Sequence, residues 1–289
     1  MLARPRCKVS LRLAAVVALM IAGVALWVLT SRGTNKERSM TSQGSVAADI
    51  TTDDLAKVSR TKVFFGHQSV GVNVLDGVPG VYAARGMAAP TIEQGGTRPD
   101  KDGGFVDHAF IGENEKPLLK IQDFDAKMRS EIGQQVDVAM MKLCYIDIMS
   151  NTDVDALFAT YRETIAALER DFPKVTFVKV TVPLMTEQGQ LSKLKSRLTG
   201  SDRYGSAENA ARERLNALIR REYAGDHFFD LAAIESTAPD GSRAIGTYKG
   251  QQYYRLYDGY ASDSGHLNGE GARVAATAWL MAVAQASPK

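Results

Sequence analysis

Cysteine is nearly absent from this sequence, which contains two in 289 residues. Cys7 precedes a long apolar run near the N-terminus, and Cys144 lies in the middle of the chain. Cys144 therefore has no partner in the part of the chain that follows the apolar run, and we expect no disulfide there even in an oxidising compartment. We interpret Cys144 as a small buried residue in preference to a nucleophile.

Histidine is also scarce, with four residues, and no two of them have the paired spacing of a metal-binding helix. Asp263-x-x-His266 alone is too sparse to specify zinc. The glycine-containing stretch 66–71 lacks the Lys-Ser/Thr pair of a phosphate-binding P-loop. The sequence therefore predicts neither a metal ion nor another cofactor.

An excess of charge of one sign is missing as well, since 35 basic and 33 acidic residues leave a net charge of +2. No basic run is interleaved with aromatic residues in the part expected to fold, so nucleic acid is not an expected partner. The sequence does not predict an oligomeric state.

One long apolar run is present, from residue 13 to residue 30, and it carries no charge. As a helix it would be about 27 Å long, enough to cross a bilayer. A cleaved signal peptide is the alternative, but no small-x-small site follows the run. We expect a cytoplasmic N-terminus (1–12), a transmembrane signal anchor (13–30), a flexible tether (31–52) and an extracytoplasmic, periplasmic or cell-surface domain (53–289).

Strand and helix patterns alternate through this domain, which predicts α/β architecture. A parallel five-stranded sheet with helices on both faces, a three-layer α/β/α sandwich of flavodoxin-like type, fits this order. Strands are predicted at Lys62–Gly66, Asp107–Ile111, Val136–Leu143, Val175–Val182 and Asp226–Leu231.

A polar segment, Gly66-His67-Gln68-Ser69, ends the first predicted strand. Ser69 would therefore lie at the carboxyl edge of the sheet, where α/β proteins bind ligands and where a serine can act as nucleophile. The simpler alternative is that Ser69 caps the helix that follows.

Near the other end of the chain, Asp263 precedes His266 by three residues in a loop that leads into a final helix. Such a loop can place the carboxylate on one imidazole nitrogen and leave the other free to accept a proton from a hydroxyl. His67 is too close to Ser69 along the chain to serve as this base, and His108 and His227 lie in apolar strand contexts.

These blocks together resemble the SGNH/GDSL hydrolase superfamily, with Gly66-His67-Gln68-Ser69 in place of Gly-Asp-Ser. The resemblance covers about residues 60–285 and implies a Ser69-His266-Asp263 triad. Phe110-Ile111-Gly112-Glu113-Asn114 resembles the second block of the family and would supply oxyanion donors from the Gly112 N–H and the Asn114 amide, although a turn glycine and a helix-capping asparagine are the alternative.

The third block departs from the family pattern, because Leu143-Cys144-Tyr145-Ile146-Asp147 replaces Gly-x-Asn-Asp. Asn114 or the Tyr145 hydroxyl could substitute for the missing donor, or the oxyanion hole could have two donors. Further along, five tyrosines between residues 248 and 260 either contact a sugar ring or pack in a β-hairpin against the fold.

Taken together, the sequence predicts a membrane-tethered serine esterase that removes O-acyl or O-acetyl groups from a small molecule or an envelope glycan. The alternatives are an O-acetyltransferase with the same triad and a non-catalytic glycan-binding protein. Because a histidine base must be neutral to accept a proton, the esterase hypothesis predicts activity that rises with pH through about 6 to 7.

Overall fold

The structure is a computed structural model that describes residues 50–95, 103–187 and 205–288. Cys7, the predicted anchor (13–30) and the tether up to residue 49 lie outside these ranges. Within them, no helix has the length and apolar character needed to cross a bilayer. Ile50 is buried and Thr51 caps the first described helix, so these two residues of the predicted tether belong to the folded domain.

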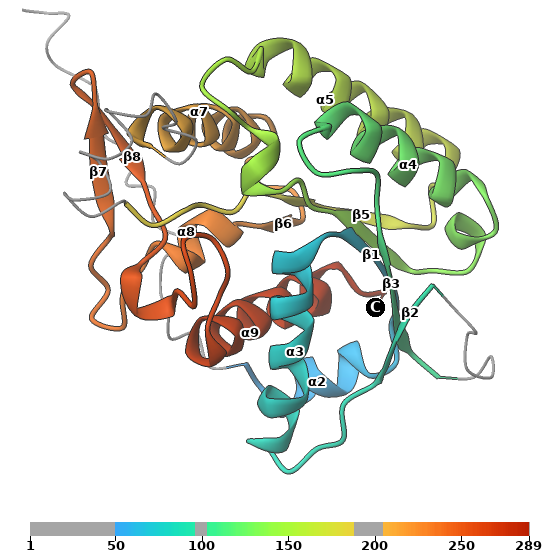
Figure 1. Cartoon of the computed structure of the whole chain (residues 1–289). Helices are drawn as coiled ribbons and strands as arrows, with labels where there is room; N and C mark the ends of the chain where they lie inside the picture. Colours follow the sequence, from blue (N-terminus) through green and yellow to red (C-terminus); the bar gives the residue numbers. More distant parts are fainter. Residues whose placement is uncertain (1–49, 96–102, 188–204, 289) are drawn as a thin grey trace, which may run out of the picture. The chain divides into compact units, whose positions relative to one another are not determined.

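A six-stranded parallel sheet forms the centre of the domain, in the order β2-β3-β1-β4-β5-β6 (Figure 1). The predicted fold class is confirmed, although the sheet has one strand more than expected. The strands are β1 Lys62–His67, β2 Thr91–Gln94, β3 Phe105–Phe110, β4 Val138–Met141, β5 Thr176–Val180 and β6 Phe228–Phe229.

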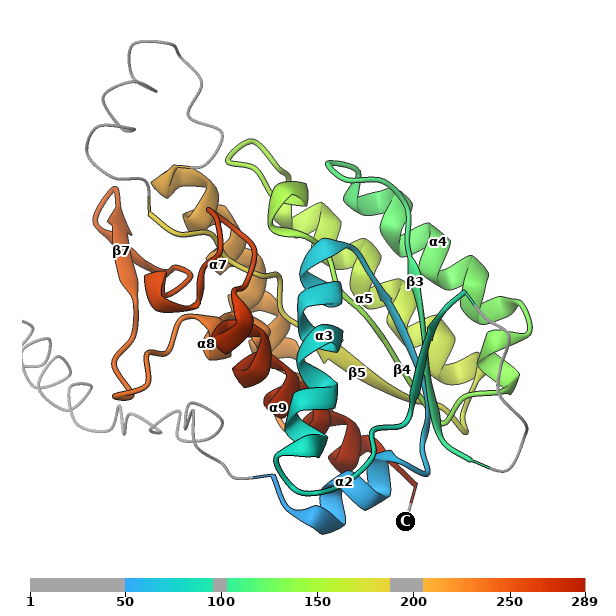
Figure 2. The same ribbon diagram turned by 60° about the horizontal axis from the view of Figure 1, so that its bottom comes forward.

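Helices cover both faces of this sheet (Figures 1 and 2). One face carries α2 Thr52–Val58, α3 Ser69–Ala83, α8 Leu231–Glu235 and α9 Gly269–Ala286. The other face carries α4 Pro117–Arg129, α5 Val154–Asp171 and α7 Ser206–Glu222. Short 3-10 turns are η1 Ile132–Gln134, η2 Tyr145–Asp147 and η3 Asp258–Tyr260, and an antiparallel hairpin pairs β7 Ile245–Tyr248 with β8 Gln251–Tyr254.

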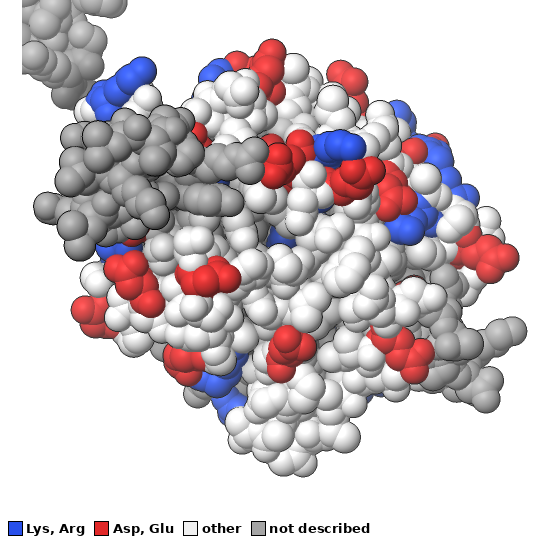
Figure 3. Space-filling view, viewed as in Figure 1, with Lys and Arg blue, Asp and Glu red and all other residues white. Residues whose placement is uncertain are grey.

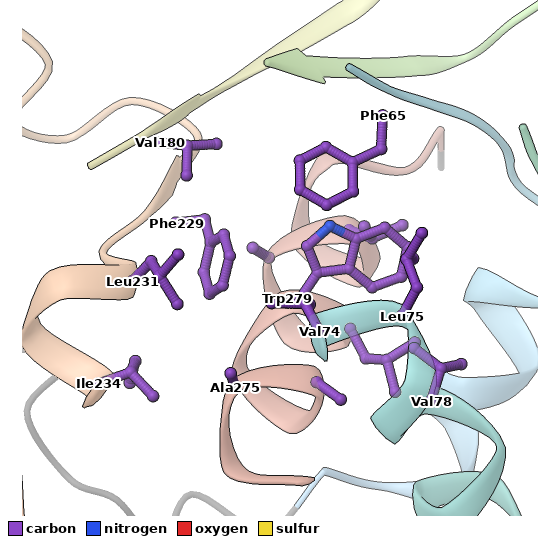
Figure 4. Packing of buried hydrophobic residues seen from close by; sticks show 14 of the residues in the cluster. Phe65, Val74, Leu75, Val78, Val180, Phe229, Leu231, Ile234, Ala275 and Trp279 are labelled. Carbon is purple, nitrogen blue, oxygen red and sulfur yellow. The ribbon is translucent and has the colours of Figure 1, made fainter. Parts of the chain in front are cut away.

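Strand β1 is buried on both faces, as its apolar run predicts. Phe64 packs in the core beneath α4 and α5, whereas the next residue, Phe65, packs in the core beneath α3 and α9. Trp279 of α9 is fully buried beside Phe65, and its indole N–H donates to the sulfur of Met140 at 3.0 Å (Figure 4). The contacts between α3 and α9 bring together the two segments that carry the candidate site.

The strand order determines where a site can form. Strands β2 and β3 lie on one side of β1, whereas β4, β5 and β6 lie on its other side. The topological switch point of the sheet therefore lies between β1 and β4. Parallel α/β sheets bind ligands outside the carboxyl ends of the strands at such a switch point. Ser69, which follows β1, lies at this position.

Candidate active site

Ser69 is the first residue of α3, and its side chain is not used to cap the helix. The capping position is occupied by Gln68, which makes no side-chain capping bond. Ser69 is exposed, and its Oγ lies 2.9 Å from Nε2 of His266, 197 positions along the chain. The hydroxyl of Ser69 therefore has a potential base within hydrogen-bond distance.

The imidazole of His266 bridges Ser69 and Asp263. Its Nδ1 lies 2.7 Å from Oδ2 of Asp263, whose Oδ1 accepts hydrogen bonds from the N–H groups of Gly265 and His266, both at 2.8 Å. Because an ionised carboxylate only accepts hydrogen bonds, Nδ1 must carry the proton and Nε2 can accept one from Ser69. The structure thus brings the three predicted residues together in the expected order.

Asp263 is kept ionised by this loop. Partial burial alone would raise the pKa of its carboxyl group, but the hydrogen bonds from Gly265 and from His266 outweigh burial and hold the pKa below its usual value. The carboxylate therefore remains able to orient the imidazole across the whole neutral range.

Several contacts hold the loop of His266 against the rest of the fold. The N–H of Leu267 donates to Oδ1 of Asn73 on α3 at 3.2 Å, and the N–H of Thr186 donates to the carbonyl of Ser264 at 2.9 Å. Asn73 lies one helical turn after Ser69 and so on the same face of α3. Sequence reasoning missed Asn73, although this four-residue spacing was a signal that could have identified it.

Tyr145 lies beside the histidine. Its ring meets the His266 ring edge-on, with centroids 5.8 Å apart. A side chain at Gly265 would come within 2.6 Å of the tyrosine ring, so glycine is required there. The carbonyl of Tyr145 accepts a 2.8 Å hydrogen bond from the buried guanidinium of Arg212. This packing limits the positions available to the imidazole.

The two residues predicted to supply oxyanion donors after β3 differ in their availability. Gly112 has a φ of +49°, and its N–H donates to Oδ2 of Asp123 at 2.8 Å, so a role as oxyanion donor would require that bond to break. Asn114 is exposed and accepts a 2.9 Å hydrogen bond from Lys120 through its Oδ1. The amide of Gln68 donates to the carbonyls of Ile111 and Gly112, which ties this loop to the residue before Ser69.

A pair of histidines lies under the start of α3. His67 is fully buried, stacks on His108, and places Nε2 3.0 Å from Nδ1 of His108. Since Nδ1 of His67 lies 2.8 Å from the carbonyl of Gln68, it must donate there, and His108 must donate to Nε2 of His67. Burial lowers the pKa of His67 to about 3 and also lowers that of His108. The pair is therefore neutral and structural, which for His108 agrees with its apolar strand context in the sequence.

A second buried titratable group lies on α8. Glu235 is fully buried and accepts the N–H of Leu184 through Oε1, whereas Oε2 has no hydrogen-bond partner. Burial raises its pKa to about 8, although Lys142 and Arg212 oppose this shift. The folded protein therefore holds a proton on Glu235 at neutral pH.

These two groups predict how stability depends on pH. His67 has a pKa of about 3 in the folded state against 6.5 as a reference, so stability falls as pH falls through that interval. Glu235 has a pKa of about 8 in the folded state against a reference value of 4.5, so stability falls as pH rises through that interval. Each contributes about 1.4 kcal/mol per pH unit, and the two effects cancel between pH 4.5 and 6.5.

We therefore expect the free energy of unfolding to decrease by about 2 kcal/mol between pH 6.5 and 8 through Glu235. Glu235→Gln should remove this decrease, and the exposed Glu163→Gln should retain it. Urea unfolding of the three proteins at both pH values measures the difference. An equal decrease in Glu235→Gln would contradict the assignment to this carboxyl group.

The tyrosine-rich segment forms the antiparallel hairpin β7–β8 and the turn that follows it. Tyr253 and Tyr260 are buried in the core, and the ring of Tyr254 packs against the guanidinium groups of Arg220 and Arg243. The tyrosines thus pack largely against the fold, which is the second of the two interpretations of their sequence pattern.

Charged side chains are scattered in small groups over the face along which α3 runs, and the middle of that face is largely uncharged (Figure 3).

Cys144 is buried and free, as expected. Among the residues that the structure describes, no three His, Cys, Asp or Glu side chains are grouped to hold a metal ion.

Comparison with known proteins finds similarity only among solved structures. No protein-family model matches the chain, and no curated protein matches it. A protein of Slackia heliotrinireducens assigned to the SGNH hydrolases has a TM-score of 0.44 and 12% identity, over 78% of this chain and 99% of its own.

Two further structures have comparable similarity. The periplasmic domain of a lipopolysaccharide acetyltransferase from Salmonella ser. Paratyphi A has a TM-score of 0.42 and 13% identity, over 77% of this chain and 83% of its own. Phospholipase A1 from Streptomyces albidoflavus has a TM-score of 0.40 and 13% identity, over 79% of this chain and 100% of its own.

Some of the solved structures that match the chain are assigned to the SGNH/GDSL hydrolases, the superfamily that its sequence blocks resemble. Identities and TM-scores this low carry no argument about chemistry.

Proposed function

We propose that this protein is a serine-dependent esterase in which Ser69 is the nucleophile, His266 the general base and Asp263 the residue that orients the base. The observation that supports it best is the continuous chain of contacts, 2.9 Å from Ser69 Oγ to His266 Nε2 and 2.7 Å from His266 Nδ1 to Asp263 Oδ2. A serine hydroxyl is a poor nucleophile at neutral pH without such a base.

In the proposed mechanism, Nε2 of His266 takes the proton from Ser69 as Oγ attacks the ester carbonyl. The tetrahedral intermediate collapses, and the imidazolium returns its proton to the departing alcohol. Water, deprotonated by the same nitrogen, then releases the acid from the acyl-enzyme and regenerates the Ser69 hydroxyl. Asp263 stabilises the imidazolium that forms in each half of the cycle.

The oxyanion would be met by the backbone N–H of Ser69, because the first N–H groups of a helix lack carbonyl partners within it. The amide of Asn114 is the second proposed donor, and the Tyr145 hydroxyl is a third candidate. The N–H of Gly112 is a weaker candidate, since it is bonded to Asp123.

The remaining features of the hypothesis are also proposals. The substrate would be a small-molecule or glycan O-acyl ester, and the domain would be held outside the cytoplasm by the apolar segment 13–30. Tyr253, Tyr254, Tyr257 and Tyr260 all pack against the fold, so Tyr248 is the remaining candidate of the tyrosine-rich segment for contact with a sugar ring.

Reaction with a fluorophosphonate tests the proposed nucleophile. We expect a covalent adduct on the peptide that contains Ser69, together with loss of ester hydrolysis in proportion to labelling. Mass spectrometry of the digested protein locates the adduct. Absence of both labelling and hydrolysis in the folded protein would contradict the esterase and favour a non-catalytic binding protein.

The same preparation can separate hydrolysis from acyl transfer. An esterase should release free acetate from an acetyl ester at the same yield with and without added oligosaccharide. Capture of most of the acetyl group by the oligosaccharide would replace the esterase with an O-acetyltransferase that uses the same residues.

A further inference from the structure

A buried ion pair joins two loops at the carboxyl edge of the sheet. Nζ of Lys120 lies 2.7 and 2.8 Å from the two oxygens of Asp147, and both side chains are fully buried. Asp147 also accepts the N–H groups of Cys144 at 2.6 Å and of Glu115 at 2.9 Å. The pair therefore fastens the loop after β3 to the loop after β4.

Stability alone is a poor explanation for such a pair. The free energy needed to remove two charges from water often exceeds the free energy gained from their attraction. Apolar residues of similar volume are frequently at least as stabilising. Lys120 lies on α4 beside Ile121 and Phe124 of the apolar core, where an apolar side chain would be the ordinary choice. The position of the charges calls for a role beyond packing.

The loop that the pair fastens is held in an unfavourable backbone conformation. Gly112 has a φ of +49°, and Glu115, which is not a glycine, has a φ of +67°. Left-handed backbone at a residue with a side chain is uncommon and costly, and such conformations cluster at functional sites as well as in turns. The hydrogen bond from Glu115 to Asp147 holds this conformation in place.

Within this loop, Asn114 is oriented by Lys120. An ammonium group can only donate, so the atom of Asn114 that lies 2.9 Å from Nζ must be the amide oxygen. The amide nitrogen, with its two N–H groups, then lies on the other side of an exposed side chain. The same loop is bonded through Ile111 to the amide of Gln68, the neighbour of Ser69.

We propose that Lys120 and Asp147 are positioning residues that hold the Asn114 amide as an oxyanion donor. The inference rests on the esterase function proposed above. Lys120 acts on the reaction only through Asn114, since the ammonium is buried and its described partners are Asn114 and Asp147. The loop after β4, which lacks the family's donor asparagine, thus contributes Asp147 as a support for a donor from the neighbouring loop.

The donor role is tested with Asn114→Asp. The aspartate keeps an oxygen for Lys120 and nearly the same shape, but it has no N–H to offer an oxyanion. We expect kcat for a short acyl ester to fall about a hundredfold with KM changed by less than about threefold. Lys116→Met, which removes the exposed Lys116–Glu113 pair of the same loop, should leave kcat unchanged.

The positioning role is tested by a double-mutant cycle. Lys120→Met with Asp147→Asn removes both charges together, and we expect kcat to fall roughly tenfold or more when Asn114 is present. In the Asn114→Asp background the same change should lower kcat by less than about twofold, because its effect passes through the missing amide. If the variant with Lys120→Met and Asp147→Asn does not fold, Lys120→Gln, which keeps a neutral N–H donor, replaces Lys120→Met in the cycle.

The outcomes separate this inference from the esterase hypothesis. If hydrolysis depends on Ser69 but Asn114→Asp has wild-type kcat, or if removing the ion pair lowers kcat equally in both backgrounds, the positioning role is wrong and the esterase stands. If wild-type hydrolysis does not depend on Ser69, the proposed function itself fails.

Discussion

Replacement of Ser69 by alanine should lower kcat/KM for a short acyl ester by at least about a thousandfold. The substitution removes only the oxygen that lies 2.9 Å from His266 and leaves the exposed start of α3 otherwise intact. Binding of substrate should change little, because the loss falls on a bond made in the transition state. Steady-state kinetics of purified protein, with thermal unfolding as a check of folding, measures the effect.

A suitable control is Ser206→Ala, since Ser206 is also the first residue of a helix but lies on α7, far along the chain from the three proposed catalytic residues. It should keep wild-type activity. His266→Ala should be about as damaging as Ser69→Ala, and the double variant should be no worse than either, because residues that act as a unit are not additive. Wild-type activity in Ser69→Ala would refute the proposed nucleophile.

The sequence was sufficient for those parts of the fold that local pattern determines. The apolar run of β1 predicted a strand buried on both faces, and the alternation of strands and helices predicted the layers. Strand β2 was missed because Thr91–Gln94 is a short, partly polar strand at the edge of the sheet. An edge strand of this kind has no apolar periodicity to distinguish it from a loop.

In the candidate site as well, local sequence predicts some of the contacts and tertiary packing determines the others. Asp263 and His266 are three residues apart, so a single loop brings them together and the sequence can reveal the pair. Ser69 reaches this pair because α9 packs against α3. In the sequence, only the resemblance to a known family suggested that the three residues lie together.

Partnerships made by tertiary packing could not be predicted. The open N–H expected at Gly112 is bonded to Asp123, eleven positions further along, because α4 turns back over the loop. Lys120 and Asp147 are likewise invisible in the sequence, since charged residues on an amphipathic helix and in a turn normally face solvent. Buried charges of this kind are recognised only when both partners are placed in space.

Glycine at position 71 is required by the ring beneath it, and Gly71→Ala is expected to damage both stability and activity. A Cβ at this position would lie 2.3 to 2.5 Å from Cβ, Cγ and Nδ1 of His67. That ring is fixed, because it is buried, stacks on His108, packs at a tilt against Phe65, and is hydrogen-bonded through both nitrogens. The start of α3 must therefore move, and Ser69 moves with it.

Overpacking of this kind typically lowers the free energy of unfolding by about 1 to 3 kcal/mol. A displacement of about 1 Å at a reacting group can lower kcat by about a hundredfold. Gly80→Ala, in the same helix, is the matched control, since no atom beyond its chain neighbours and the backbone of its own helix lies within 4 Å of the added Cβ.

Gly80→Ala should instead increase stability by roughly 0.5 to 1 kcal/mol through helix propensity and leave kcat unchanged. Urea unfolding and steady-state kinetics of both variants, measured side by side, test the prediction. Because the two substitutions are chemically identical, their difference isolates the contact between Gly71 and His67. If Gly71→Ala matched Gly80→Ala in both measurements, the His67 ring would have to be free to move, and the histidine pair could not support the position of Ser69.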